Sequence, residues 1–156
     1  MLSRSFEDFK VGQTVSTRGR TVEQSDVNAF AGLTWDFYPL HTDELYAQST
    51  RFGRRILHGP LVYAMAVGLM PIDFFGDAIV AFLGVKDLRH LAPVYPGDTI
   101  QVRATVQEAN AKGQGGGVVS IEYVVLNQDQ TTVMHANLQF LMRASGSSAM
   151  NEPEGV

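Results

Sequence analysis

The segment HGPLVYAMAVGLMPIDFFG, residues 58–76, constrains the fold more than any other part of this chain. It opens with Gly59 and Pro60, and because proline is well tolerated in the first helical turn, it predicts a helix that begins there. A surface helix carries its apolar residues on one stripe, but this helix is apolar all round, so we expect protein on every side of it. Its longest apolar run, residues 61–70, is too short to span a bilayer.

After this helix the sequence predicts four strands with no helix between them. Residues 98–107, 118–126 and 131–142 alternate apolar and polar side chains, the two-residue period of a strand with one buried face. Residues 78–88 begin with apolar side chains on both faces, so that strand is predicted to be buried on both sides. Successive strands without an intervening helix pair antiparallel. The predicted buried face consists of Ile100, Val102, Ala104, Val106, Val119, Ile121, Tyr123, Val125, Met134, Ala136, Leu138, Phe140 and Met142.

The first half of the chain has a different pattern. Residues 23–33 and 42–49 are short helical segments with acidic side chains in the first turn, where the helix dipole favours them, and a further strand is predicted near residues 13–22. A long buried helix with an antiparallel sheet wrapped around it is an α+β architecture, the hot dog fold. We expect this domain to occupy residues 1–143 and predict a disordered tail at residues 144–156, which are small, polar and aperiodic.

The composition excludes several classes of function. A chain of 156 residues forms one domain with a full core. The net charge is −4 and no long basic run is present, so nucleic acid is not an expected partner. The absence of cysteine excludes disulfides, thiolate nucleophiles and cysteine-bound metals. The N-terminus has no apolar run of the kind found in signal peptides, so we expect a cytoplasmic protein without membrane contact.

One segment combines titratable and aromatic side chains. WDFYPLHTDELY, residues 35–46, places Asp36 five residues before His41. On a continuous helix these two would lie on different faces, but Pro39 pushes the residue before it towards extended geometry, and a bent loop can bring both side chains together. A carboxylate and a histidine with a near-neutral pKa form a workable acid–base pair. The alternative is structural, with Asp36 and His41 capping neighbouring backbone groups.

The stretch FAGLTWDFYPLHTDELYAQSTRFGRRILHGPLV resembles the hydratase motif of the MaoC-like family, the (R)-specific enoyl-CoA hydratases and dehydratases. LRHLAPVYPGDTI is similar to the family's strand–turn–strand after the helix, and the resemblance runs from about residue 6 to residue 142. Trp35 and Tyr38 stand where the family usually has Gly and Asn, which puts large rings near the site. The positions that carry the resemblance are Asp36, Pro39, Leu40, His41, Phe52, Gly53, His58 and Gly59.

The resemblance implies that Asp36 and His41 hold one water between them. They would deliver hydroxide to C3 and a proton to C2 of a trans-2-enoyl-CoA, giving an (R)-3-hydroxyacyl-CoA, or would catalyse the reverse dehydration. It also implies that the N–H of Gly59 binds the thioester carbonyl, and the positive end of the helix dipole agrees with this. The structural alternative for Gly59 is a simple helix cap. Coenzyme A enters as part of the substrate, no other cofactor and no metal is expected, and a homodimer is implied.

Other residues carry weaker signals. Arg51, Arg54 and Arg55 are candidates for contacts with coenzyme A phosphates, or they form a solvated basic cluster. His90 carries no signal of its own, and His135 is predicted to face solvent from the polar side of its strand. The residues expected around the substrate are Trp35, Phe37, Tyr38 and His58, of which His58 is expected chiefly to pack or to orient the loop.

Two rival functions remain open at this stage. A hot dog acyl-CoA thioesterase would require an acid on the buried helix, which has none before Asp73 at its end. A non-catalytic acyl-CoA-binding or partner subunit would be free to lose Asp36 or His41. We therefore expect a hydratase or dehydratase, and the bulk of the three aromatic side chains suggests a restricted pocket for a short or unusual acyl group.

Overall fold

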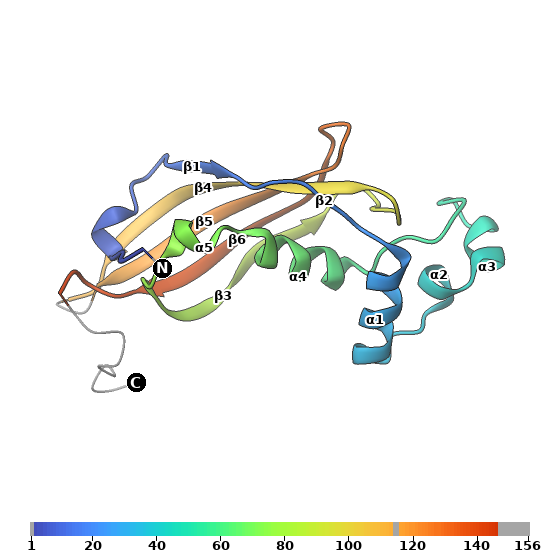
Figure 1. The fold of residues 1–156 in the computed structure, drawn as a ribbon, viewed down its shortest axis with the longest axis horizontal. Coiled ribbons are helices and arrows are strands. Elements are labelled where there is room, and N and C mark those ends of the chain that lie inside the picture. Colours follow the sequence, from blue (N-terminus) through green and yellow to red (C-terminus); the bar gives the residue numbers. More distant parts are fainter. Residues whose placement is uncertain (1, 114–115, 147–156) are drawn as a thin grey trace.

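The structure is a computed structural model that describes residues 2–113 and 116–146 (Figure 1). The predicted disordered tail falls mostly outside this range, at residues 147–156, and stays a prediction there. Within residues 144–146, the Ser145 N–H donates to Glu7 Oε2 at 3.1 Å. The elements are the 3-10 helix η1 Phe6–Asp8, helices α1 Gln24–Thr34, α2 Pro39–Thr42, α3 Glu44–Gln48, α4 Gly59–Leu69 and α5 Ile72–Phe75, and strands β1 Thr14–Ser16, β2 Arg20–Thr21, β3 Ile79–His90, β4 Thr99–Ala111, β5 Gly117–Leu126 and β6 Thr132–Met142.

The strands form one antiparallel sheet in the order β1-β4-β5-β6-β3, with β2 also paired to β4. The four predicted strands after the helix are confirmed, and the early strand is present as the short β1 and β2. Val102 pairs with Val125, and Tyr123 pairs with Ala136. Because paired residues point to the same side of a sheet, the alternation in each strand becomes one continuous apolar surface.

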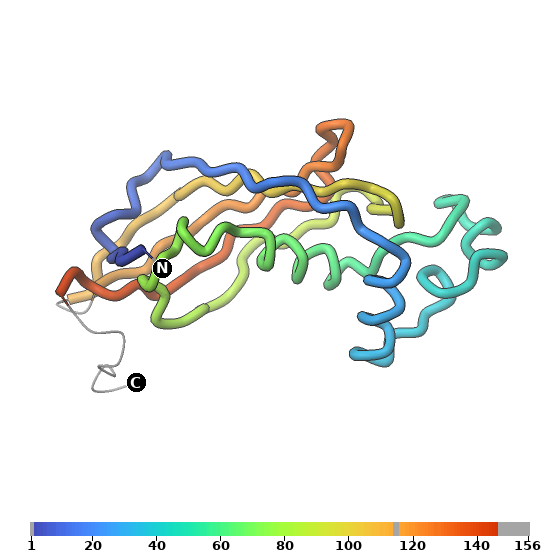
Figure 2. Tube along the Cα trace, viewed as in Figure 1, coloured from blue at the N-terminus to red at the C-terminus, as the bar shows by residue number. Residues whose placement is uncertain are grey.

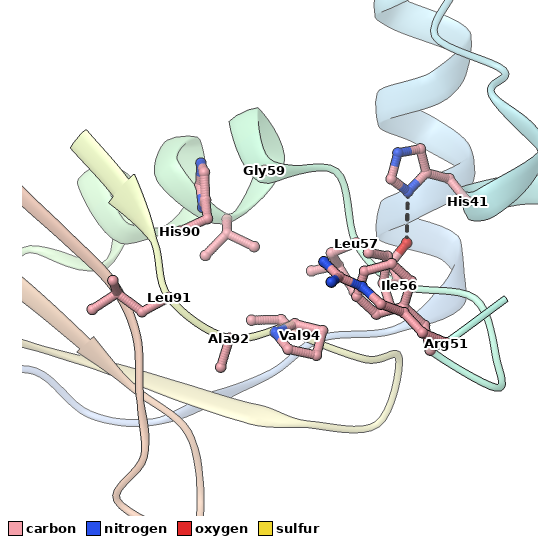
Figure 3. Close-up of a pocket in the computed structure, with 12 residues that line it drawn as sticks. His41, Arg51, Ile56, Leu57, Gly59, His90, Leu91, Ala92 and Val94 are labelled. Carbon is pink, nitrogen blue, oxygen red and sulfur yellow. Dashed lines mark hydrogen bonds between the residues drawn. The ribbon is translucent and has the colours of Figure 1, made fainter.

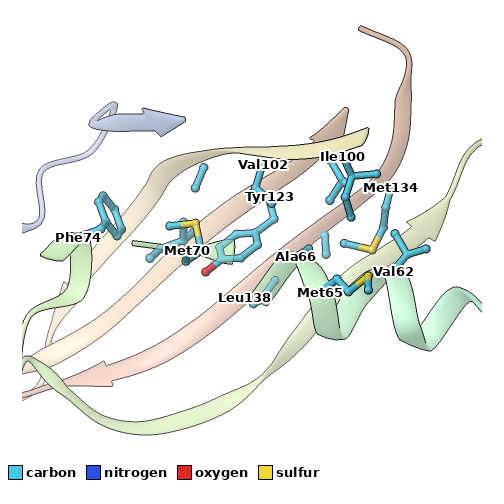
Figure 4. Close-up of a cluster of buried hydrophobic side chains, with 14 of the residues drawn as sticks. Val62, Met65, Ala66, Met70, Phe74, Ile100, Val102, Tyr123, Met134 and Leu138 are labelled. Atoms are coloured by element: carbon cyan, nitrogen blue, oxygen red, sulfur yellow. The ribbon is translucent and has the colours of Figure 1, made fainter. Parts of the chain in front are cut away.

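Helix α4 packs against this surface, and the core lies between them (Figure 4). None of the thirteen side chains predicted for the buried face is more than 5% exposed. From the helix side, the buried residues are Leu61, Val62, Met65 and Ala66. The antiparallel sheet around a long helix is therefore confirmed. In the part of the chain that the structure describes, no helix is long and apolar enough to cross a membrane.

Two burial predictions are wrong for the single chain. Helix α4 is not covered on every side, because Ala64, Val67 and Gly68 are exposed. Strand β3 is not buried on both sides. It lies at the edge of the sheet, with no further strand beside it in the described part of the chain. Four of its apolar side chains are between 40 and 52% exposed: Ile79, Val80, Phe82 and Leu83.

Helices α1, α2 and α3 project beyond the end of the sheet, next to the amino end of α4 (Figures 1 and 2). The N-terminal segment lies at the opposite end, where the Phe6 N–H donates to the Arg143 carbonyl at 2.8 Å. The two predicted helical segments, 23–33 and 42–49, are confirmed as α1 and α3. The fold thus places the Asp36–His41 segment beside the first residues of α4.

Candidate functional site

The segment that holds Asp36 is shaped by the end of α1. Trp35 follows the last helical residue with a φ of 64°, in the left-handed region, and its N–H donates to the Ala31 carbonyl at 2.8 Å. This geometry ends the helix and turns the chain. Pro39 then opens the short helix α2, which carries His41. The expected break between Asp36 and His41 is therefore present.

Three side chains from different elements meet at this turn. The ligand atoms of Asp36, His41 and His58 all lie within 4.8 Å of one another. The rings of His41 and His58 are stacked, with centroids 3.9 Å apart and planes tilted by 29°. The expected proximity of Asp36 and His41 is confirmed, and their catalytic roles stay predictions.

Hydrogen bonding determines which nitrogen of His41 is free. Its Nδ1 lies 2.8 Å from the Ile56 carbonyl (Figure 3). A carbonyl oxygen only accepts, so Nδ1 carries the proton and the neutral ring has its lone pair on Nε2. Burial lowers the pKa of His41 below the ordinary 6.5; the bond to Ile56 opposes this shift, and His58 adds to it. His41 is therefore neutral at pH 7 and able to accept a proton.

His58 supports the segment that holds Asp36 and His41. Its side chain is 1% exposed, and its Nε2–H donates to the backbone carbonyl of Asp36 at 2.9 Å. The other nitrogen, Nδ1, is buried and has no hydrogen-bond partner among the described residues. His58 thus holds Asp36 through the backbone and His41 through ring stacking, as expected of a residue that orients the loop.

The same three groups resemble a set of metal ligands in type and spacing, but their geometry disfavours a shared ion. Ring lone pairs lie in the ring planes, and planes stacked 3.9 Å apart with a 29° tilt meet far from both rings. A metal–nitrogen bond reaches only about 2 Å. His41 Nδ1 and His58 Nε2 are also engaged by carbonyl groups. The cluster suits proton transfer better than metal binding.

A cavity of about 350 Å³ opens beside this cluster, between the amino end of α4 and the segment after β3 (Figure 3). Its lining is largely apolar, and His41, Arg51 and His90 are its ionisable side chains. The Gly59 N–H has no acceptor among the described residues, and Pro60 has no N–H. Gly59 lies in the cavity wall. A free backbone donor at a helix amino end therefore faces the same space as His41.

Of the ionisable side chains in the cavity wall, His90 is the one that the sequence did not indicate. It is the last residue of β3, and its ring packs on Gly59 so closely that a Cβ built at Gly59 would lie 2.8 Å from His90 Nε2. Thirty-one positions separate the two in the chain. Only the curvature of the sheet around α4 brings them together.

Of the other predicted site residues, only some lie at the cavity. Arg51 lines the cavity, the Arg54 guanidinium lies 4.0 Å from the centre of the Tyr95 ring, and Arg55 pairs with Glu44 at 2.7 Å. In the single chain Trp35, Phe37 and Tyr38 are exposed and lie outside the cavity wall, so their part in the pocket stays a prediction.

His135 lies far from the cluster along the chain, on the polar face of β6. It is half-buried rather than fully solvent-facing, and its Nε2 lies 3.0 Å from Glu122 Oε1.

Comparison with known proteins identifies the family. The MaoC like domain matches residues 7–128, which is most of the chain. The chain belongs to the MaoC-like dehydratase family. Over 101 residues it is 39% identical to an (R)-specific enoyl-CoA hydratase of Rhodospirillum rubrum, covering 65% of this chain and 68% of that protein. It is 37% identical over 109 residues to Protein MaoC of Klebsiella aerogenes, where the match covers 70% of this chain and 32% of the relative.

Solved structures of MaoC-like proteins share the fold. A monoamine oxidase regulatory protein from Archaeoglobus superposes with a TM-score of 0.84 at 38% identity, over 91% of this chain and 95% of that one. Rv0216 of Mycobacterium tuberculosis, described as a double hot dog fold, matches with a TM-score of 0.79 at 19% identity, over 96% of this chain and 46% of its own. The second match shows the fold alone. The hot dog fold is thereby confirmed, and relatives of this MaoC-like protein are named as hydratases and dehydratases.

Proposed function

We propose that this MaoC-like protein catalyses the reversible hydration of a trans-2-enoyl-CoA to an (R)-3-hydroxyacyl-CoA. The C2=C3 π bond breaks, a C3–O bond to the water forms, and a proton is added at C2. The observation that carries the proposal is the convergence of Asp36 on His41, which lines a cavity together with Gly59, whose N–H has no acceptor among the described residues.

The pair has the two functions that the reaction needs. His41 presents an unprotonated Nε2, and Asp36 is exposed beside it, with one oxygen accepting the Tyr38 N–H at 3.3 Å. A water between them can lose a proton to one group while the other group completes the transfer to C2. The water oxygen at C3 and the proton at C2 then add to the same face of the substrate, which is syn addition.

The thioester carbonyl develops negative charge as the water oxygen adds to C3, and it loses this charge when C2 gains its proton. The Gly59 N–H lies at the positive end of the 11-residue helix α4 and is free to donate. Donors fixed in advance at the developing charge stabilise the transition state more than the ground state. Gly59 also allows close approach of the thioester because it has no side chain.

The active form is proposed to be a homodimer. The exposed apolar side chains of β3, together with those on the outer side of α4, form a surface that a second copy can cover. The edge of β3 also has no strand partner in the single chain. The projecting α1–α3 segment exposes Leu33, Trp35, Phe37, Tyr38 and Leu45 in the same way.

The test is hydration of crotonyl-CoA, followed by loss of the enoyl-thioester absorbance, with the stereochemistry of the product determined. Wild-type protein should give the (R)-alcohol, and Asp36→Asn should reduce kcat by about 10²-fold or more, the scale of lost acid–base catalysis. Asp43→Asn is the matched control, because Asp43 caps α3 through the Tyr46 N–H and asparagine caps helices equally well.

The rival functions give different results in this assay. Release of coenzyme A without hydration would indicate a thioesterase. Binding of enoyl-CoA esters of several chain lengths without turnover would indicate a non-catalytic binding subunit. Faster turnover of long chains than of short ones would contradict the restricted pocket suggested by Trp35, Phe37 and Tyr38.

A further inference from the structure

We propose that His90 is a second hydrogen-bond donor to the thioester carbonyl, acting beside the Gly59 N–H, and is thus a further catalytic residue. This inference rests on the proposed function. It adds a group from β3 to a site whose other members come from the 36–59 segment, and it gives the carbonyl oxygen two donors from opposite sides.

The geometry allows one oxygen to meet both groups. The Cβ position of Gly59 lies 2.8 Å from His90 Nε2, and a Cβ lies about 2.5 Å from its own backbone nitrogen. The two nitrogens are therefore at most about 5.3 Å apart. Two hydrogen bonds of about 2.9 Å each span up to about 5.8 Å between their donors, so a single acceptor can bridge them.

The ring of His90 makes no polar contact within the described part of the fold. Its nitrogens have no hydrogen-bond or ion-pair partner among the described residues, in contrast to the three other histidines, which all have one. A phenyl ring would fill the same space against Gly59. His90 instead lines a cavity whose walls are mostly apolar, where a hydrogen bond to a ligand is strong because water competes less.

His90 is suited to donate as a neutral ring. Partial burial lowers its pKa below 6.5, and no carboxylate lines the cavity to favour the charged form. A neutral imidazole with the proton on Nε2 donates one hydrogen bond, and this is an established way to polarise a carbonyl group at pH 7. The carbonyl then carries more negative charge in the transition state than in the ground state, so both donors favour reaction.

The experiment compares His90→Phe, which keeps a ring but has no donor, with His90→Gln, which keeps an N–H. His90→Phe should lower kcat on crotonyl-CoA by about 10- to 100-fold, approaching the loss for one oxyanion donor, with KM changed less than about threefold. His90→Gln should recover at least part of that loss. His135→Phe, the same change on another strand, serves as the control and should keep full activity.

A second readout does not depend on turnover. The absorbance of 2,4-hexadienoyl-CoA moves to longer wavelength when its carbonyl accepts hydrogen bonds. The shift on binding should be reduced in His90→Phe and retained in His90→Gln. If His90→Phe does not fold by circular dichroism, His90→Met also removes the donor and takes its place.

The outcomes separate this inference from the proposed function. Wild-type kcat and an unchanged spectral shift in His90→Phe would overturn the inference while the hydratase assignment stands, and so would a rise in KM alone. A wild-type protein that hydrates no enoyl-CoA but shows a His90-dependent shift would overturn the proposed function and support the contact of His90 with the carbonyl.

Discussion

At the scale of single residues, the site depends on which ring nitrogen of each histidine carries the proton. His41 gives Nδ1–H to the Ile56 carbonyl, and His58 gives Nε2–H to the Asp36 carbonyl. The two stacked rings therefore have opposite tautomers. The backbone carbonyls, rather than the carboxylate of Asp36, set these proton positions, so the proposed role of the Asp36 side chain with water does not compete with them.

The pH dependence of activity should follow His41. Its folded-state pKa is lowered, chiefly by burial, so kcat/KM should fall as the pH drops through an inflection below 6.5. The unfolded chain binds this proton at higher pH than the folded chain does. The free energy of unfolding is therefore undiminished above the pKa of His41 in the unfolded chain. It decreases as the pH falls from that pKa towards the lower pKa in the folded chain. A pH–rate profile and urea unfolding at several pH values measure both effects.

An acidic inflection above 6.5, or none at all, would contradict the proposal that activity needs the neutral form of His41. In the control Asp36→Asn, the residual activity should still show its acidic inflection at a pH below the ordinary histidine pKa of 6.5. This is expected because Asp36 is the smallest of the named influences on the pKa of His41.

Arg51 should matter for coenzyme A rather than for chemistry. Its side chain lines the cavity, whereas Arg55 already pairs with Glu44. Arg51→Ala should raise KM for crotonyl-CoA by about 3- to 10-fold, the scale of one partly exposed charge-assisted hydrogen bond, and leave kcat unchanged. Initial-rate kinetics measure this. Arg55→Ala should change KM less.

The substrate crotonyl-N-acetylcysteamine, which has no phosphate, sharpens this test. Its KM should be the same for the wild type and Arg51→Ala. An equal rise for both substrates would show that Arg51 shapes the cavity instead of binding phosphate.

At the scale of elements, the candidate site forms where the amino end of α4 contacts the last residue of β3. The helix supplies the free N–H of Gly59, and the strand supplies the ring of His90 that packs on it. Neither element makes a binding site alone. Their contact depends on the sheet curving around the helix, with core residues of α4 such as Met65 and Ala66 packed against the strands (Figure 4).

Gly59→Ala should separate stability from activity at this contact. The added methyl group would lie 2.8 Å from His90 Nε2, and the ring, at the end of its side chain, can turn away, so the cost in stability should be only about 1 kcal/mol. The kcat should fall at least tenfold because His90 is displaced and the thioester approach is obstructed. Thermal unfolding and kinetics on crotonyl-CoA measure the two effects.

Gly32→Ala is the matched control for this substitution. Gly32 lies in α1 with nothing within 4 Å of an added Cβ, so alanine should stabilise the helix by up to about 1 kcal/mol and leave kcat unchanged. Full activity in Gly59→Ala would show that neither close approach nor the position of His90 matters.

At the scale of the whole molecule, one chain leaves its apolar surface incomplete. Helix α4 is apolar on a side that the single chain exposes, and β3 has half-exposed apolar side chains along an unpaired edge. Large apolar side chains exposed on both elements mark a candidate interaction surface.

Leu83→Lys should disrupt the proposed dimer. Leu83 is 52% exposed on the β3 edge, and a buried lysine without a partner opposes association. Sedimentation velocity should show a wild-type dimer and a largely monomeric variant. The variant should have the lower melting temperature, and the melting temperature should depend on protein concentration only for the wild type. Arg103→Glu, on the polar face of β4, is the control. A monomeric wild type would contradict the proposal.

Local pattern was sufficient for the elements and much of the site. The alternation in residues 98–142 predicts the buried face correctly because strand periodicity depends only on backbone geometry. The Gly59–Pro60 start of the helix likewise follows from the properties of the two residues themselves. The resemblance of the 35–59 segment to the MaoC-like motif located Asp36, His41 and Gly59, since these residues lie close together in the chain.

The sequence by itself therefore determined the helix, the strands, the buried face of β4, β5 and β6, and the family. Tertiary structure alone decided that His90 packs on Gly59, that His58 stacks on His41, and that β3 is an exposed edge. An apolar strand gives the same sequence signal whether the second layer that buries it comes from its own chain or from another. Contacts between distant segments depend on how the sheet curves, and no local pattern encodes that curvature.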